Sequence, residues 1–203
     1  MKLIFATGNA GKIREAREIL GPSFEIVSPR DLGIFDDPEE TGSTFRENSL
    51  IKARAIYDAT GLDCFADDSG LVVDALGGAP GIYSARYAAL ENPQAAEGDL
   101  SHNFAANRAR LLRELGDSND RSARFRCVVT LILGGEEYFF DGTMEGSIAR
   151  KCEGDLGFGY DPLFIADDCP GMTLGQAGES VKNKVSHRGK ALSAMAEFLA
   201  TRK

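Results

Sequence analysis

The segment SARFRCVVTLILGGEEYFFDGTMEG, residues 122–146, constrains the fold more than any other part of the chain. Two runs rich in β-branched and aromatic residues meet at Gly134–Gly135, and a two-glycine junction between such runs is typical of a tight β-hairpin turn. A hairpin of this length has an apolar face that must be buried against other elements. The chain therefore contains a sheet that helices or further strands cover.

The remaining pattern alternates helices with strands. We expect strands over 2–6 and FEIVS, and LDCFADDSGLVVDAL predicts two strands joined by a polar turn at Asp67–Gly70. Apolar residues at helical spacing and capping signals predict helices over 12–20, 44–59, 100–115 and 186–199. This order predicts an α/β fold: a mixed, elongated, twisted sheet with helices packed on it. Ligands on such sheets bind where loops leave the strand ends.

Composition narrows the class of protein. The 203 residues, 43% of them hydrophobic, predict a single domain over 1–203. The net charge of −8 argues against a nucleic-acid partner, which requires a broad basic surface. The first residues, MKLIFATGN, contain too short an apolar run for a signal peptide or a membrane span, so we expect a cytoplasmic protein with no membrane partner.

The stretch FATGNAGKIRE, residues 5–15, has the ingredients of a phosphate-binding loop. Thr7, Gly8, Asn9 and Gly11 precede a helix whose N-terminus favours an anion, and Lys12 adds a positive charge. The glycine spacing is not that of a Walker A loop, which has four residues between its glycines. A plain strand-to-helix turn with an exposed lysine remains an alternative interpretation of this stretch.

Acidic residues occur beside segments that are expected to be buried. Glu39–Glu40 lies in an acidic loop, and Asp67–Asp68 lies between two apolar runs. Buried carboxylates need a cationic partner, and carboxylate oxygens are also the ligands that Mg²⁺ prefers. On the helix over 44–59, Asn48 and Lys52 share one face, so Lys52 is a candidate partner. Ordinary turn chemistry and a surface lysine remain the alternatives.

Two further stretches suit a nucleotide. LGFGYDP, residues 156–162, presents Phe158 between glycines, where a base can stack, although Phe158 in the core would give the same pattern. VKNKVSHRGKAL places Lys182, His187 and Arg188 around the start of the last helix. Such a cluster suits an anionic or oxo-bearing ligand, although a solvated basic face is equally compatible with it.

Taken together, ATGNAGK, EETGSTFRENSLIKA, ADDSGLVVDALGGAPGIYSARYA, GFGYDP and VSHRGKAL resemble, in order and wording, the inosine triphosphate pyrophosphatase family. The resemblance spans almost the whole chain. It implies Mg²⁺-dependent hydrolysis of ITP, dITP and XTP to the monophosphate and pyrophosphate by a homodimer. It also implies an elongated α/β fold with the active site in a cleft between two lobes.

The resemblance assigns roles position by position. The phosphate chain would be bound by Thr7, Gly8, Asn9, Ala10, Gly11 and Lys12. Glu40 and Asp68 correspond to the metal carboxylates, and Asp68 also to the proton acceptor, with Asp67 beside it. Lys52 and Ser69 would reach the triphosphate. The base and sugar pocket would be formed by Phe158, Gly159, Tyr160, Asp161, Lys182, His187 and Arg188.

Base choice follows from hydrogen-bond chemistry. Hypoxanthine and xanthine present an acceptor at position 6, where adenine presents a donor, and Arg188 can only donate.

Three alternatives stay open at this stage: a pyrophosphatase of the same fold for pyrimidine or modified nucleotides, a nucleotide-binding regulator without turnover, and an RNA- or DNA-binding module.

Overall fold

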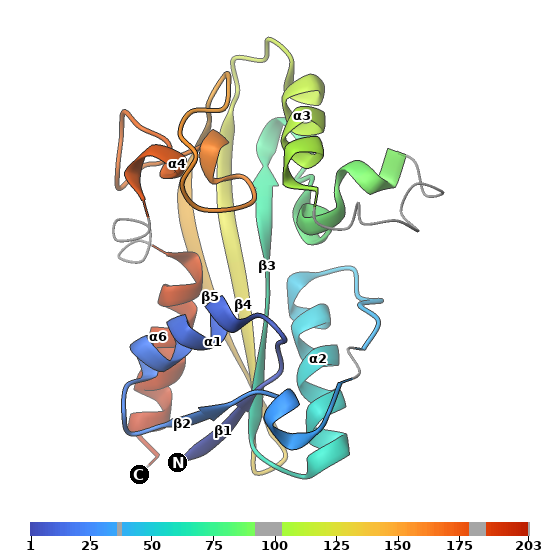
Figure 1. Cartoon of the computed structure of the whole chain (residues 1–203), viewed down its shortest axis with the longest axis vertical. Helices are drawn as coiled ribbons and strands as arrows, with labels where there is room; N and C mark the ends of the chain where they lie inside the picture. Colours follow the sequence, from blue (N-terminus) through green and yellow to red (C-terminus); the bar gives the residue numbers. More distant parts are fainter. Residues whose placement is uncertain (36–37, 92–102, 179–185, 203) are drawn as a thin grey trace. The chain divides into compact units, whose positions relative to one another are not determined.

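The structure is a computed structural model that describes residues 1–35, 38–91, 103–178 and 186–202. Figure 1 shows the order of its helices and strands. The strands are β1 (Lys2–Phe5), β2 (Glu25–Val27), β3 (Cys64–Val73), β4 (Ser122–Leu133), β5 (Glu136–Ile148) and β6 (Phe164–Ala166). The α-helices are α1 (Ala10–Leu20), α2 (Phe45–Thr60), α3 (Phe104–Leu115), α4 (Leu174–Ala177) and α6 (His187–Ala200).

The six strands form one mixed sheet in the order β2-β1-β3-β4-β5-β6. β1 runs parallel to both β2 and β3, whereas β6 pairs antiparallel with β5. The hairpin predicted over 122–146 is confirmed, because β4 and β5 are neighbours joined at Gly134–Gly135. Both glycines have positive φ, 59° and 89°, as the tight hairpin turn requires. The predicted α/β class with a mixed sheet is confirmed.

One sequence-based expectation is wrong. LDCFADDSGLVVDAL does not form two strands around a polar turn, because β3 runs without interruption from Cys64 to Val73. Asp67 and Asp68 therefore lie inside a strand and are buried. They remain in the sheet because Asp67 is paired with Lys12 and Arg188 and Asp68 with Lys52, which offsets the cost of burying a charge.

The chain divides into two compact units. The first unit contains Met1–Ser69, Cys127–Thr143 and His187–Lys203, and the second contains Gly70–Arg126 and Met144–Ser186. The expectation of a single domain with two lobes around a cleft stays a prediction. No helix in the described part of the chain combines the length and apolarity needed to cross a membrane.

In the first unit, side chains along β1, β3 and β4 alternate between two covered faces. Helices α1 and α6 lie side by side over one face, and α2 covers the other (Figure 1). The α1/α6 face buries the strand residues Leu3, Phe5, Phe65, Cys127, Val129 and Leu131. The α2 face buries the strand residues Ile4, Cys64, Ala66 and Ile132. This alternation decides to which side every polar residue of the strands points.

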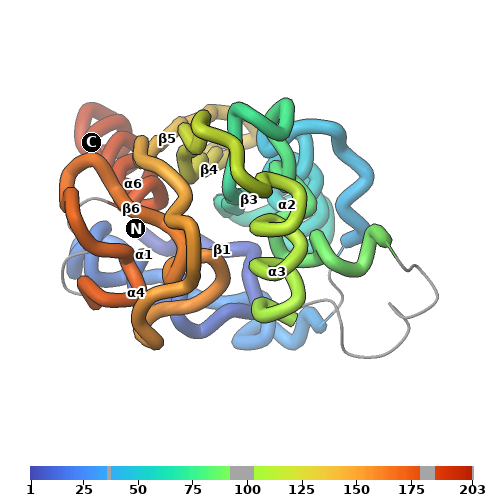
Figure 2. Tube along the Cα trace, turned by 90° about the horizontal axis from the view of Figure 1, so that it is seen from above, coloured from blue at the N-terminus to red at the C-terminus, as the bar shows by residue number. Residues whose placement is uncertain are grey.

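The second unit has its own core between its part of the sheet and α3. Within it, α4 packs against β6 and the short helix Asp161–Leu163, and Figure 2 shows the chain there looping around α4. The core includes Leu71, Leu111, Phe125, Met144, Leu163 and Phe164. This unit carries the LGFGYDP segment.

Candidate active site

Asp67 and Asp68 follow each other in β3, so the pleat of the strand turns their side chains to opposite faces. Asp67 lies on the same face as Phe65, under α1 and α6, and Asp68 lies on the same face as Ala66, under α2. Both carboxylates are buried, with 1% of Asp67 and 8% of Asp68 exposed. Each therefore meets a different set of cations.

Asp67 is held between two helices. Lys12 Nζ, from α1, lies 2.8 Å from its Oδ1, and Arg188 Nε, from α6, lies 2.9 Å from its Oδ2. The Cys127 thiol of β4 lies 4.0 Å from the same Oδ2. Burial alone would raise the pKa of Asp67, but the charges of Lys12, Arg188 and Lys52 outweigh it, and the net effect is a lowered pKa. Asp67 is an ionised anchor for two cations.

Asp68 faces Lys52 of α2. Lys52 Nζ lies 3.2 Å from Asp68 Oδ1 and 2.7 Å from Glu40 Oε1. Burial raises the pKa of Asp68, and the nearby charge of Glu40 adds to the rise, although Lys52 opposes it. Burial alone would lower the pKa of Lys52, but Asp68, Asp67 and Glu40 outweigh it and keep the ammonium charged. A carboxylate with a raised pKa accepts a proton more readily than an ordinary aspartate.

The loop before α1 is organised by its own side chains. Asn9 caps the helix, since its Oδ1 accepts hydrogen bonds from Gly11 N and Lys12 N at 2.9 and 3.2 Å. Thr7 Oγ1 accepts a hydrogen bond from Asn9 N at 3.2 Å. The loop is exposed from Gly8 to Gly11. Helix α1 begins at Ala10, two residues earlier than predicted, so Gly11 and Lys12 lie in its first turn, and Lys12 is bound to Asp67.

Arg188 is buried and its guanidinium is enclosed by three acceptors. Besides Asp67, it donates through Nη1 to Glu15 Oε2 at 2.8 Å and through Nη2 to Ser69 Oγ at 3.3 Å. Burial alone would lower its pKa, but the charges of Asp67 and Glu15 outweigh it and raise the pKa. Arg188 and Ser69, both predicted site residues, are therefore in contact.

The predicted base-binding segment lies in the second unit. Phe158 is 57% exposed, whereas Tyr160 and Asp161 are buried. Asp161 Oδ2 accepts a hydrogen bond from Phe158 N at 2.9 Å, and the Tyr160 hydroxyl donates to Ser84 O at 3.0 Å. The Gly159 carbonyl accepts a hydrogen bond from Arg108 Nη1 at 2.6 Å. The segment is a braced loop with an exposed phenyl ring.

The remaining predicted site residues are His187, the first residue of α6, and Lys182. His187 is buried there, and its backbone carbonyl is so close to β5 that a Cβ at Gly142 would lie 2.0 Å from it. Lys182 lies outside the described residues. Its predicted contact with a nucleotide stays a prediction.

Several residues that contact the predicted site residues were not identified from the sequence. Glu15 binds Arg188, Cys127 adjoins Asp67, and Arg108 holds the Gly159 carbonyl. Glu15 lies three residues after Lys12 on α1, so helical spacing from the predicted loop was a usable signal for it. Cys127 and Arg108 belong to β4 and α3, and only the tertiary structure brings them to these positions.

Within the described residues, no group of three or more His, Cys, Asp and Glu side chains is placed to hold a metal ion. Two carboxylates are a sufficient protein contribution for Mg²⁺, which takes its other ligands from water and substrate phosphates. Among the same residues, the buried Asp68 Oδ2 has no hydrogen-bond partner. An unpartnered carboxylate oxygen beside the Glu40–Lys52 pair fits a hard divalent cation.

Comparisons with known proteins show which family the chain resembles. A sequence model of the Ham1 family matches residues 3–198. The dITP/XTP pyrophosphatase of Treponema denticola is 44% identical over 201 residues, covering 98% of each chain. That of Xylella fastidiosa is 47% identical over 206 residues, again covering 98% of each chain. Among solved structures, the Ham1 protein of Staphylococcus aureus superposes over 100% of both chains, with a TM-score of 0.86 and 38% identity.

Proposed function

This chain belongs to the Ham1 family, and on that premise we propose that it hydrolyses the non-canonical purine triphosphates ITP, dITP and XTP to the monophosphate and pyrophosphate. The family membership confirms the resemblance found in the sequence, and the names of the relatives are those of nucleoside triphosphate pyrophosphatases. By this reaction the protein would remove non-canonical nucleotides from the cellular pool.

The observation that carries the proposal is the cluster of Asp68, Lys52 and Glu40. It combines a carboxylate with a raised pKa, an ammonium that burial does not neutralise, and a second carboxylate on the same ammonium. Water that attacks a phosphorus atom must lose a proton, and Asp68 is the group suited to accept it. Lys52 would then stabilise the negative charge that develops on the phosphate oxygens.

The α1 side of β3 would hold the rest of the triphosphate. The loop from Thr7 to Lys12 would bind the departing pyrophosphate through the helix N-terminus and the Lys12 ammonium. Asp67 fixes the position of Lys12 through the 2.8 Å ion pair. The two carboxylates of β3 would thus have different roles: Asp68 accepts the proton of the water, and Asp67 positions the Lys12 ammonium.

Mg²⁺ is the cofactor that these residues suit. Glu40 and Asp68 would hold it, with Asp68 Oδ2 as an oxygen that has no other partner in the described residues. When bound, the ion would supply positive charge against the phosphate oxygens.

For base choice, Arg188 stays the proposed donor to the 6-oxo group. A guanidinium has five N–H donors, and three of them bind Glu15, Asp67 and Ser69, so a base would be contacted by the other two. Phe158 would stack on the base, and Gly159, Tyr160, Asp161, Lys182 and His187 are proposed to complete its surroundings. We expect Arg188→Ala to reduce the ratio of kcat/KM for ITP over ATP; an unchanged ratio would remove this role.

One assay tests the reaction. Purified protein is mixed with ITP, dITP, XTP, GTP, ATP and the pyrimidine triphosphates, with and without Mg²⁺, and both pyrophosphate and orthophosphate are measured. Pyrophosphate from the first three substrates, only with the metal, is the expected result. Orthophosphate as the product would contradict the proposal. A preference for pyrimidine triphosphates would also contradict it and indicate the pyrimidine pyrophosphatase, and nucleotide binding without turnover would indicate the regulator.

We also propose that the protein works in the cytoplasm as a homodimer without a nucleic-acid partner. The net charge of −8 supports the last point. Light scattering at micromolar concentration measures the assembly, and a monomeric mass would contradict the homodimer.

A further inference from the structure

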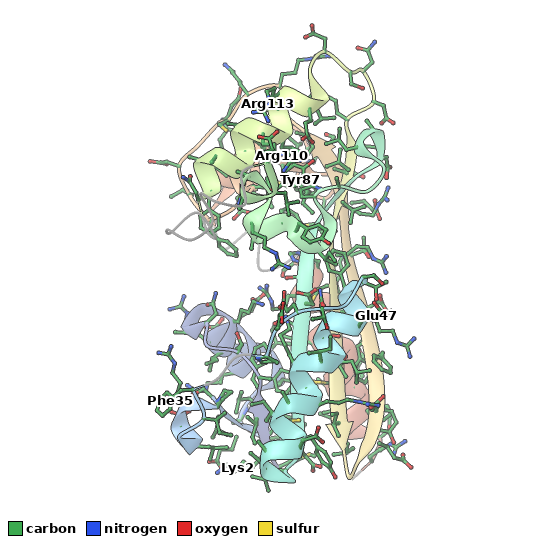
Figure 3. All side chains as sticks on the ribbon, turned by 90° about the vertical axis from the view of Figure 1, so that its right-hand side faces the viewer. Lys2, Phe35, Glu47, Tyr87, Arg110 and Arg113 are labelled. Atoms are coloured by element: carbon green, nitrogen blue, oxygen red, sulfur yellow. The ribbon has the colours of Figure 1, made fainter. Side chains whose placement is uncertain are left out.

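Two residues at the start of α2 hold the loop that carries Glu40. Gly42 N donates to Asn48 Oδ1 at 2.9 Å. Ser43 N and Thr44 N donate to Glu47 Oε2 at 2.6 and 3.1 Å. Figure 3 shows Glu47 at this end of α2. Three consecutive backbone N–H groups of the loop are therefore bound by two consecutive side chains of one helix.

The loop backbone lies directly on the helix at Gly42. A Cβ built at this residue would lie 2.6 Å from Asn48 Oδ1 and 2.7 Å from Glu47 Cβ, both shorter than any normal contact. Asn48 is fully buried, at 0% exposure. In the described residues its Nδ2 has no hydrogen-bond partner. Burying an unpaired amide donor is unfavourable. The stabilising interaction of the Asn48 side chain is therefore the hydrogen bond that its Oδ1 accepts from Gly42 N.

The same helix also binds the carboxylate of this loop. Glu40 lies two residues before Gly42, and its Oε1 is 2.7 Å from Lys52 Nζ. Lys52 follows Asn48 by one helical turn and lies on the same side of α2. Helix α2 therefore fixes the loop through three side chains: Asn48 and Glu47 bind its backbone, and Lys52 binds its acidic side chain.

We propose that Asn48 is a positioning residue of the active site. By holding Gly42, it fixes where the Glu40 carboxylate lies relative to Asp68, and so determines whether the two carboxylates act on one cation. The inference rests on the proposed function, which assigns Glu40 and Asp68 to the metal. Replacing a residue that does not bind the metal itself but orients a metal ligand typically lowers metal affinity or activity about 10–100-fold.

The test is a pair of double-mutant cycles. Asn48→Ala and Gly42→Ala disturb the contact from its two sides, and each is made alone and together with Glu40→Gln. We expect each single variant to lower kcat/KM for ITP about tenfold or more. In the Glu40→Gln background the same changes should have less than about a twofold effect, because residues that act through one another are not additive. Equal losses in both backgrounds would overturn the inference.

The matched control is Ser49→Ala. Ser49 is the next residue of α2, is fully buried, and its hydroxyl pairs with Thr130 Oγ1 of β4 at 2.6 Å. The Ser49→Ala substitution removes a buried hydrogen bond of the same helix, so we expect it to lower Tm, as we expect of Asn48→Ala. In contrast to Asn48→Ala, its kcat/KM should stay within about twofold of the wild type. If Asn48→Ala does not fold, Gly42→Ala decides the question alone.

A second readout does not depend on turnover. Binding of Mn²⁺ to the nucleotide-free protein, followed by loss of the free-ion EPR signal, should weaken about tenfold in Asn48→Ala and not in Ser49→Ala. Unchanged Mn²⁺ binding in Asn48→Ala, with Glu40→Gln impaired, would overturn the inference alone. If Glu40→Gln itself changes neither turnover nor Mn²⁺ binding, the metal assignment of the proposed function fails and the inference fails with it.

Discussion

Asp67 and Asp68 are neighbours in β3 whose side chains point to opposite faces of the sheet and bind cations from different helices. Both carboxylate oxygens of Asp67 are bound, Oδ1 by Lys12 and Oδ2 by Arg188, and the pKa of Asp67 is lowered despite burial. Asp68 has one lysine partner and an unpartnered Oδ2 within the described residues, and its pKa is raised. Two adjacent residues of one type are thus expected to differ in what they do.

The first prediction contrasts the two carboxylates. We expect Asp68→Asn to lower kcat about 10²–10⁴-fold, as loss of a general base does, while Tm stays equal or rises, because a carboxylate that is costly to ionise has been removed. Asp67→Asn should instead cost about 3–5 kcal/mol of unfolding free energy, since it removes one partner of a buried ion pair. Pyrophosphate assays at saturating Mg²⁺ and thermal unfolding measure both; near-normal turnover by Asp68→Asn would contradict the assignment.

The second prediction concerns acid stability. The folded-state pKa of Asp67 lies below its ordinary value of 3.8, so the unfolded chain binds more protons as the pH falls. The stabilisation is fully present above about pH 5 and decreases as the pH falls toward the folded-state value. Urea unfolding between about pH 6 and pH 3 should therefore show a steeper loss of free energy in the wild type than in Asp67→Asn. Parallel curves would show that Asp67 is not the group responsible.

The third prediction separates binding from folding in the loop before α1. A Cβ built at Gly8 would meet no described atom within 4 Å, so Gly8→Ala should leave Tm unchanged or slightly higher. A phosphate chain that approaches the loop backbone would meet the added methyl group, so KM for ITP should rise severalfold. An unchanged KM would mean that the substrate does not approach Gly8.

The fourth prediction concerns the loop that carries Phe158. Arg108 Nη1 donates to the Gly159 carbonyl at 2.6 Å, so Arg108→Ala should loosen the loop and raise KM for ITP severalfold with little change in kcat. The matched control is Arg113→Ala on the same helix, whose side chain, labelled in Figure 3, pairs instead with Glu91. Steady-state kinetics of both variants decide the point; equal effects on KM would contradict a role for the Gly159 contact.

Local signals predicted much of the fold. The two glycines between β4 and β5 have the positive φ of a hairpin turn. Thr44 and Glu47 form the capping box that begins α2, and Gly61 ends the helix in the left-handed conformation. These features depend on residues a few positions apart, and such short-range preferences are the part of folding that sequence patterns record directly.

The continuous β3 could not be predicted in this way. Asp67, Asp68 and Ser69 have the composition of a turn, and their place inside a strand is explained by Lys12, Lys52 and Arg188, which are distant in the sequence. Arg108 and Cys127 could not be identified from the sequence for the same reason, because each contacts a site residue that is distant in the chain.

The sequence by itself determined the family, the reaction class it suggests, and which residue types carry the chemistry, because ordered motifs and helix and turn signals are local properties of the chain. Only the tertiary structure decided that Asp67 and Asp68 have different partners. The pleat of β3 turns successive side chains to opposite faces, and the packing of α1 and α6 on one face and α2 on the other determines which cation each carboxylate meets.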